Sequence, residues 1–152
     1  MAEPAQCVLC REPGGQILVE TTQWRVVLAT EADALPFPGF TRVIWQPHIR
    51  EMSALSGPDQ ITMMSLVFAV ESLMIKYLQP DKINLASLGN MVDHLHWHVI
   101  PRWQQDSHFP RPIWAAPLPD RKPYALDPAR LERYTQAVIE HFSAQAADHS
   151  SG

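Results

Sequence analysis

The stretch at residues 93–103, DHLHWHVIPRW, constrains the fold more than any other part of the sequence. Successive side chains of a β-strand point to opposite faces of its sheet, so strict alternation of polar and apolar residues predicts a strand. We expect this strand to cover 94–103, with the imidazoles on one face and the apolar side chains on the face toward the core. The alternating residues are His94, Leu95, His96, Trp97, His98 and Val99.

The spacing of the three histidines limits how they can share chemistry. Neighbours on one face of a regular strand lie about 6–7 Å apart, and the outer two imidazoles lie about 13 Å apart. A zinc–imidazole bond is about 2 Å long, so His94 and His98 cannot bind one metal from a regular strand. Separate roles for the three rings are therefore favoured. A polar strand face with incidental histidines is the alternative, and strict alternation disfavours it.

Four shorter stretches have the composition of strands, and one longer stretch has that of a helix. The expected strands cover 16–21, 24–29, 41–46 and 82–88. Ser56 is a suitable N-cap for the helix, and Pro58 and Asp59 suit its first turn. Apolar residues then recur at helical spacing as far as Leu78, and Pro80 ends the helix. These elements predict an α+β fold with one long helix and an about five-stranded, mainly antiparallel sheet.

The length of 152 residues suits a single domain, which we expect over 1–142 with its core at 7–103. A proline-rich extension follows at 104–126 and is expected to run over the surface. A C-terminal helix is predicted over 127–142, and the tail at 143–152 is expected to be flexible. The apolar residues that share one face of this helix are Leu131, Tyr134, Val138 and Phe142.

Charge and hydropathy exclude several classes of partner. The formal net charge of −4 argues against a surface that coats a nucleic-acid polymer, although it allows a nucleotide in a local pocket. The most apolar stretch is interrupted by Ser65, Glu71 and Lys76, which favours a buried helix over a membrane span. The first residues lack a basic segment followed by an apolar run. A cytoplasmic location and no membrane partner are expected.

The only cysteines, Cys7 and Cys10, have Cys-x-x-Cys spacing. In a cytosolic chain such a pair is more typical of metal binding or redox chemistry than of a structural disulfide. One pair supplies two of the four ligands that structural zinc requires. Two reduced cysteines without a metal are the alternative.

The segment 94–100 resembles the His-φ-His-φ-His-φ-φ signature of the histidine triad (HIT) superfamily, where φ is apolar. Upstream, NLASLGN at 84–90 is similar to the family's Asn-containing strand and Gly-Gln turn, and TRVIWQPHIREMSAL at 41–55 is similar to its approach to the long helix. The resemblance covers 7–103. DSHFPRPIW at 106–114 looks like the tail of a bacterial branch, similar to diadenosine tetraphosphate hydrolases. The resemblance implies a HIT-like fold.

The resemblance also implies hydrolysis or transfer at the α-phosphate of a nucleotidyl substrate, either a dinucleoside polyphosphate or a nucleoside phosphoramidate. His96 matches the family's nucleophile, which forms a covalent nucleotidyl-histidine. Neutral imidazole is a competent nucleophile near neutral pH. His98 is expected to contact the same phosphate and stabilise charge, and Asn84 matches a position that contacts the nucleotide or phosphate. Backbone amides at Gly89 and Asn90 are expected to bind phosphate oxygens.

A structural zinc site and a homodimer are further implications of the resemblance. Cys7, Cys10, His48 and His94 match a Cys₂His₂ layout around one Zn²⁺, which would leave the other two triad histidines for phosphate. The sequence departs from the family pattern at two positions. Asn90 replaces the usual Gln, and Met91 replaces a Ser or Thr that assists the leaving group.

Two other function classes remain open at this point. The first is a zinc-dependent hydrolase in which strand histidines two residues apart bind a catalytic metal. The second is a nucleotide-binding regulatory protein without turnover, which the methionine at position 91 would allow. We expect the remaining polar candidates to lie at the surface, and these are Arg102, His108, His141 and His149. A hydrophobic wall against a base is expected within the loop at 29–40.

Overall fold

The computed structural model describes residues 4–149 and has the expected α+β architecture. Within this range five strands form one antiparallel sheet in the order β1-β2-β3-β5-β4. The helices and 3₁₀ turns are η1 (Pro4–Gln6), α1 (Val8–Arg11), η2 (Met52–Ala54), α2 (Gly57–Leu78) and α3 (Pro128–His149). The strands are β1 (Gln16–Glu20), β2 (Trp24–Leu28), β3 (Thr41–Trp45), β4 (Lys82–Ala86) and β5 (His96–Arg102).

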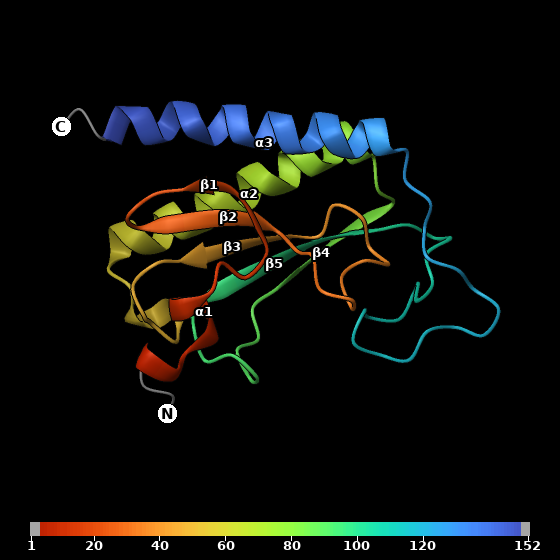
Figure 1. Ribbon diagram of the computed structural model, residues 1–152, viewed down its shortest axis with the longest axis horizontal. Helices are drawn as coiled ribbons and strands as arrows, with labels where there is room; N and C mark the ends of the chain where they lie inside the picture. Colours follow the sequence, from red (N-terminus) through yellow and green to blue (C-terminus); the bar gives the residue numbers. More distant parts are fainter. Residues whose placement is uncertain (1–3, 150–152) are drawn as a thin grey trace.

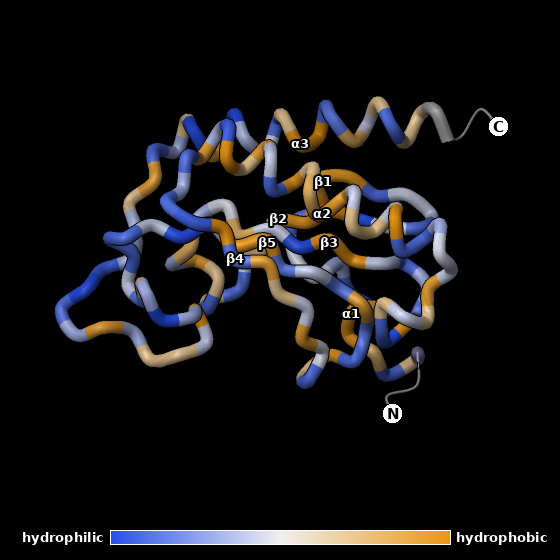
Figure 2. Tube along the Cα trace, turned by 180° about the vertical axis from the view of Figure 1, so that it is seen from behind, coloured by the Kyte–Doolittle hydropathy of each residue, from blue (hydrophilic) through white to orange (hydrophobic). Residues whose placement is uncertain are grey.

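The two long helices lie on one side of the sheet and α1 lies on the other (Figure 1). The strands turn alternate residues toward α2 and α3, so Val26, Val43 and Val99 belong to the main core. The residues between them face the other side. Along α3 hydrophobic and hydrophilic residues alternate with the turns of the helix, as expected for a helix with one buried face (Figure 2). The buried residues of this face are Tyr134, Val138 and Phe142, as predicted.

The helix α2 begins and ends where the sequence predicts. The Ser56 hydroxyl accepts a hydrogen bond from the Asp59 amide at 3.3 Å, and Gln79 ends the helix in the left-handed conformation with a φ of 51°. By length and composition α2 would be able to span a membrane. One side of it packs in the core of the domain, which accounts for its apolar composition. The residues buried on that side are Met63, Leu66, Val67, Val70, Met74 and Leu78.

The strand that carries the histidines is shorter than predicted, because β5 begins at His96 rather than at residue 94. The His94 amide bonds to the Val92 carbonyl at 2.9 Å, which makes a tight turn before the strand. Leu95 still bonds to Ile49 and Trp45 through its backbone. Consequently His94 leaves the regular alternation, while His96 keeps its predicted place on the strand.

The predicted end of the C-terminal helix and the flexible tail are wrong for residues 143–149. The helix α3 continues to His149, and residues 150–152 lie outside the described range. The segment SAQAAD that follows Phe142 has three alanines and a glutamine and has neither proline nor glycine. Alanine and glutamine have high helix propensity, which favours continuation of the helix through this segment.

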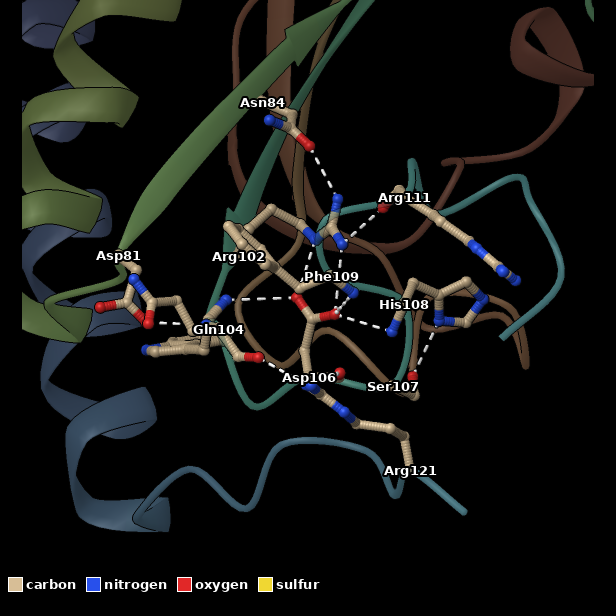
Figure 3. Close-up of polar contacts among 11 residues, drawn as sticks. Asp81, Asn84, Arg102, Gln104, Asp106, Ser107, His108, Phe109, Arg111 and Arg121 are labelled. Carbon is tan, nitrogen blue, oxygen red and sulfur yellow. Dashed lines mark hydrogen bonds and ion pairs between the residues drawn. The ribbon is translucent and has the colours of Figure 1, made fainter. Parts of the chain in front are cut away.

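The segment between β5 and α3 forms no strand or helix, as predicted, yet it is anchored by a buried ion pair. Arg102 is only 2% exposed, and its Nε donates to Asp106 Oδ2 at 2.8 Å. The other carboxylate oxygen of Asp106 accepts from the His108 and Phe109 amides at 2.8 and 2.7 Å (Figure 3). The expectation that Arg102 and His108 lie at the surface is therefore wrong. A charged pair in the core satisfies the backbone of this loop.

Candidate functional site

The candidate site lies on the face of the sheet opposite α2 and α3. Antiparallel pairing of β3 with β5 sets Arg42 opposite His98 and Ile44 opposite His96. Two small apolar clusters cover parts of this face on either side of the histidines. The first cluster consists of Cys7, Leu9, Val27 and Ile44. The second consists of Ala29, Ala34, Phe37, Phe40 and Ile100.

Hydrogen bonding leaves one ring nitrogen of His96 with a free lone pair. Its Nδ1 lies 2.6 Å from the backbone oxygen of His94. A carbonyl oxygen only accepts, so Nδ1 must carry the proton and Nε2 must be unprotonated. Burial lowers the pKa of His96 below its ordinary value, which favours the neutral ring. This is the state that a nitrogen nucleophile needs.

His98 is protonated at Nε2, unlike His96, because its Nδ1 accepts a hydrogen bond from a guanidinium. Arg42 Nε donates to His98 Nδ1 at 3.3 Å, and the proton of a neutral His98 must therefore sit on Nε2. Burial, followed by the nearby His96 and Arg42, lowers the pKa of His98 to about 3. The Phe40 ring stacks on it at 5.4 Å. His98 thus offers a neutral N–H donor, and in the free protein it carries no positive charge of its own.

Cys7, Cys10, His48 and His94 come together beside α1, as predicted, with their ligand atoms within 4.8 Å of one another. His94 Nδ1 lies 3.4 Å from Cys7 Sγ and 3.5 Å from Cys10 Sγ, and His48 Nδ1 lies 3.4 Å from Cys10 Sγ. A tetrahedral zinc with bonds of about 2.0–2.3 Å holds its ligand atoms roughly 3.3–3.8 Å apart. The donor set and these three distances therefore fit that ion.

The orientation of His94 also suits metal binding. Its Nε2 lies 2.6 Å from the Trp45 carbonyl oxygen, so Nε2 carries the proton and Nδ1 is free for the cluster. Donation of the second ring nitrogen to a carbonyl is typical of metal-bound histidines. The turn before β5 directs this ring to the cysteines. The side chain is 1% exposed.

A pocket of about 720 Å³ borders His96 and His98. The turn at Gly89 and Asn90 lines it, so the structure places these four predicted residues around one cavity. Gly89 has a φ of 83°, a conformation that favours glycine. Met91 also lines this pocket and is 96% exposed. The pocket is large enough for a nucleotide.

A second pocket of about 500 Å³ also reaches His98 and is lined by Phe40, His108 and Trp114. Trp114 borders both cavities, and its ring meets His98 edge-on at 5.6 Å. Phe37 and Phe40, both from the loop at 29–40, are almost fully buried, with exposed fractions of 1% and 2%, and they belong to the same small core cluster. Of the two, Phe40 borders this pocket. The expected hydrophobic wall against a base stays a prediction for this loop.

The structure does not bring Asn84 into these pockets. Its side-chain oxygen accepts a hydrogen bond from Arg102 Nη1 at 2.9 Å (Figure 3). Among the described residues that line either cavity Asn84 is absent. It shares a face with the histidines, since it pairs with Ile100 on β5, but its amide is part of the Arg102 network. The predicted contact with substrate is therefore not assigned to it.

Sequence reasoning missed Arg42, His108 and Trp114. Arg42 interrupts the apolar stretch of β3, and only the register with β5 reveals that it faces His98. His108 and Trp114 lie in the proline-rich extension, whose path depends on the buried Arg102–Asp106 pair. One feature of the sequence pointed to His108 and Trp114: the segment 106–114, which contains both, resembles the tail of a bacterial HIT branch. None of the three positions was separable from surface residues by periodicity.

Comparisons with known proteins agree with this geometry. The family model described as HIT domain matches residues 14–105, more than half of the chain. The chain belongs to the HIT family. A histidine triad protein from Marinobacter aquaeolei VT8 is 28% identical over 85% of this chain and 91% of that chain, with a TM-score of 0.67. A search of curated proteins gave no match.

Two more distant HIT structures share the fold. A zinc-bound HIT family protein from Mycobacterium smegmatis is 20% identical, over 94% of this chain and 99% of that chain, with a TM-score of 0.60. A diadenosine triphosphate hydrolase from Plasmodium falciparum, in complex with cyclomarin A, is 15% identical over 86% of this chain and 78% of that chain, with a TM-score of 0.56.

The depressed pKa of His98 predicts that this residue contributes to acid destabilisation. Its pKa is about 3 in the folded chain against an ordinary 6.5, so only the unfolded chain binds this proton between those values. The contribution of the neutral ring to stability is complete above pH 6.5 and is lost as the pH falls below it. His98→Gln should reduce the loss of unfolding free energy between pH 7 and pH 5 by about 2 kcal/mol.

Urea denaturation at several pH values measures this difference. His141→Gln on the exposed side of α3 is the control, and it should keep the wild-type slope. An unchanged slope in His98→Gln would contradict the lowered pKa of His98 in the folded protein.

Proposed function

We propose that the protein hydrolyses a nucleotidyl substrate at its α-phosphate through a covalent intermediate on His96. The observation that carries this proposal is the 2.6 Å hydrogen bond from His96 Nδ1 to the His94 carbonyl, which leaves Nε2 unprotonated beside a nucleotide-sized pocket. Membership of the HIT family supports the same assignment. The substrate class is a dinucleoside polyphosphate or a nucleoside phosphoramidate.

In the first step the lone pair on His96 Nε2 attacks the α-phosphorus. A P–N bond forms, the bond from phosphorus to the leaving oxygen or nitrogen breaks, and the leaving group keeps that electron pair and takes a proton from water. The imidazole becomes positively charged in this step. Its Nδ1–H remains bonded to the His94 carbonyl, and a hydrogen bond to an oxygen acceptor favours the charged ring.

In the second step water attacks the phosphorus of the nucleotidyl-histidine. The P–N bond breaks, its electron pair returns to Nε2, and the proton of the attacking water passes to solvent. A nucleoside monophosphate is released. His98 Nε2–H and the backbone amides at Gly89 and Asn90 are the donors that we assign to the non-bridging oxygens in both steps. Because Met91 has no hydroxyl, the leaving group depends on solvent for its proton.

The tautomer of His98 argues against the alternative function of a zinc-dependent hydrolase, in which strand histidines hold a catalytic zinc. A neutral imidazole binds a metal through an unprotonated nitrogen. His98 Nδ1 already accepts from Arg42, and its Nε2 carries the proton. His94 belongs to the cysteine cluster. The other alternative, a nucleotide-binding regulatory protein without turnover, predicts that no covalent intermediate forms.

We also propose that the Cys₂His₂ cluster binds a structural zinc ion. The ligand distances and the hydrogen bond that orients His94 support this ion. When bound, zinc would join the N-terminal segment, through Cys7 and Cys10, to the residue that precedes β5. Its role would be to hold that corner of the fold, separate from the phosphate chemistry.

We further propose a homodimer that forms through α2. Large exposed apolar residues recur every seven positions on its outer side, at Ile61, Phe68 and Ile75, with exposed fractions of 71%, 52% and 55%. Exposed serines at 65 and 72 lie between them. Large and small residues that alternate along one stripe are suited to interlock with a second copy of the same helix.

His96→Ala should abolish release of nucleoside monophosphate, because it removes the attacking nitrogen. The measurement is turnover of labelled diadenosine tetraphosphate and adenosine 5′-phosphoramidate, with alkaline quenching to retain any nucleotidyl-histidine. His141→Ala is the matched control, and it should keep wild-type turnover and labelling. Turnover by His96→Ala at more than a few per cent of wild type would contradict the mechanism.

Zinc should be present at one ion per chain in protein purified without chelator. Cys10→Ser should lower this content and the melting temperature, since a thiolate ligand is lost. Elemental analysis and thermal melts measure the two effects, with His141→Ala again as control. Turnover that vanishes with zinc while the melting temperature stays unchanged would instead support a catalytic metal.

Phe68→Glu should convert a dimer to a monomer, because it places a charge at the centre of the proposed helix contact. Light scattering at micromolar concentration measures the mass. Leu35→Glu, at a loop position that is 66% exposed, is the matched control and should leave the mass unchanged. A wild-type protein that is monomeric under these conditions would refute the interface.

A further inference from the structure

Arg42 is the basic residue that the two pockets have in common. It lines both cavities, and among the described residues that line them it is the only Lys or Arg. The carboxylates that line them are Glu12, Glu31 and Asp33. A polyphosphate entering this space would meet more negative than positive side chains. Any attraction for phosphate must therefore come largely from Arg42 and from neutral N–H donors.

In the free protein the guanidinium of Arg42 is already bound to a carboxylate. Its Nη1 donates to Glu31 Oε2 at 3.1 Å, and its Nη2 donates to Glu31 Oε1. A guanidinium also binds phosphate in this bidentate geometry. The Arg42 side chain is 16% exposed and the Glu31 side chain is 44% exposed. Glu31 lies on a turn, so its carboxylate can rotate into solvent while Arg42 stays in place.

Other contacts hold the arginine independently of Glu31. Its Nη1 also donates to the Gly14 carbonyl at 3.0 Å, and its carbon Cζ lies 5.0 Å from the centre of the Phe40 ring. Its Nε donates to His98 Nδ1 at 3.3 Å. Departure of the carboxylate would free Nη2 and one N–H of Nη1 on a guanidinium that its other contacts still hold. These donors would face the space that both pockets share.

We propose that Glu31 is an internal substitute for substrate phosphate: nucleotide binding exchanges the Glu31 carboxylate on Arg42 for a phosphate oxygen, while Arg42 Nε keeps His98 in the Nε2–H tautomer. The inference rests on the proposed function and names the residue that recognises the phosphate chain. Arg42 is a binding residue toward the phosphate and a positioning residue toward His98. Glu31 lowers affinity for weakly charged ligands, because it must be displaced.

The first test is binding of AMP by calorimetry to four variants. Glu31→Gln removes the competing charge and should tighten AMP binding about 2–5-fold, the range expected for an exposed ion pair. Arg42→Lys keeps the positive charge but cannot form a bidentate contact with phosphate, so it should weaken AMP binding about 10-fold. Glu140→Gln and Arg133→Lys, exposed on α3, are the matched charge and side-chain controls and should bind as wild type.

The second test reads the His98 tautomer by ¹⁵N NMR of histidine-labelled protein. Wild type and Glu31→Gln should both show His98 protonated on Nε2. Arg42→Met removes the donor to Nδ1 and should shift the ring toward a mixture of tautomers. A purely structural role for Arg42 would leave the tautomer unchanged. Where Arg42→Met fails to fold, the AMP affinity of Glu31→Gln decides the proposal.

The outcomes separate this inference from the proposed function. Unchanged or weaker AMP binding by Glu31→Gln, or wild-type binding by Arg42→Lys, would overturn the exchange even if His96→Ala is inactive. Full turnover by His96→Ala would refute the covalent mechanism, whereas the binding results would still test the exchange. Tighter binding by Glu31→Gln together with weaker binding by Arg42→Lys would support it.

Discussion

The antiparallel register of β3 on β5 is the constraint on which the rest of the site depends. It sets Arg42 beside His98 and Ile44 beside His96 on the face away from the long helices. A slip of one residue would turn both imidazoles toward α2 and bring Trp97 out of the core side, because side chains alternate along a strand. The burial of Val43 and Val99 against α2 prevents that slip. The hydrophobic core therefore fixes the position of the polar chemistry on the opposite face.

Hydrogen bonds then give chemically identical side chains different functions. His96 is protonated at Nδ1 by its bond to a carbonyl, and His98 is protonated at Nε2 because Arg42 donates to its other nitrogen. His96 therefore offers the lone pair of Nε2, and His98 offers its Nε2–H as a donor, beside the pocket that both residues line. Burial lowers the pKa of both rings, so this arrangement persists at neutral pH without a separate base. The proposed reaction at phosphorus would use both groups, the lone pair as nucleophile and the N–H as donor to a phosphate oxygen.

Local pattern was sufficient for the sheet and for α2, whereas long-range contacts decided the remainder. Alternation in the histidine stretch and the Ser56 cap are local signals, and the family model and fold agree with them. Asn84 lies on a strand that was predicted, but the hydrogen bond between its amide oxygen and Arg102, 18 positions away, has no local signal. The buried Arg102–Asp106 pair looked like surface charge, since only the folded loop shows five donors around one carboxylate. In α3 a local signal was present, because the alanine-rich segment after Phe142 has high helix propensity, and the helix continues beyond the predicted end at residue 142.

His94 contacts the Cys₂His₂ cluster through its ring and His96 through its backbone. Its Nδ1 lies 3.4 Å from Cys7 Sγ, and its backbone carbonyl accepts a hydrogen bond from His96 Nδ1–H. If the cluster holds zinc and His96 is the nucleophile, as proposed, an ion that fixes His94 would also hold the carbonyl that sets the His96 tautomer, without contact to phosphate.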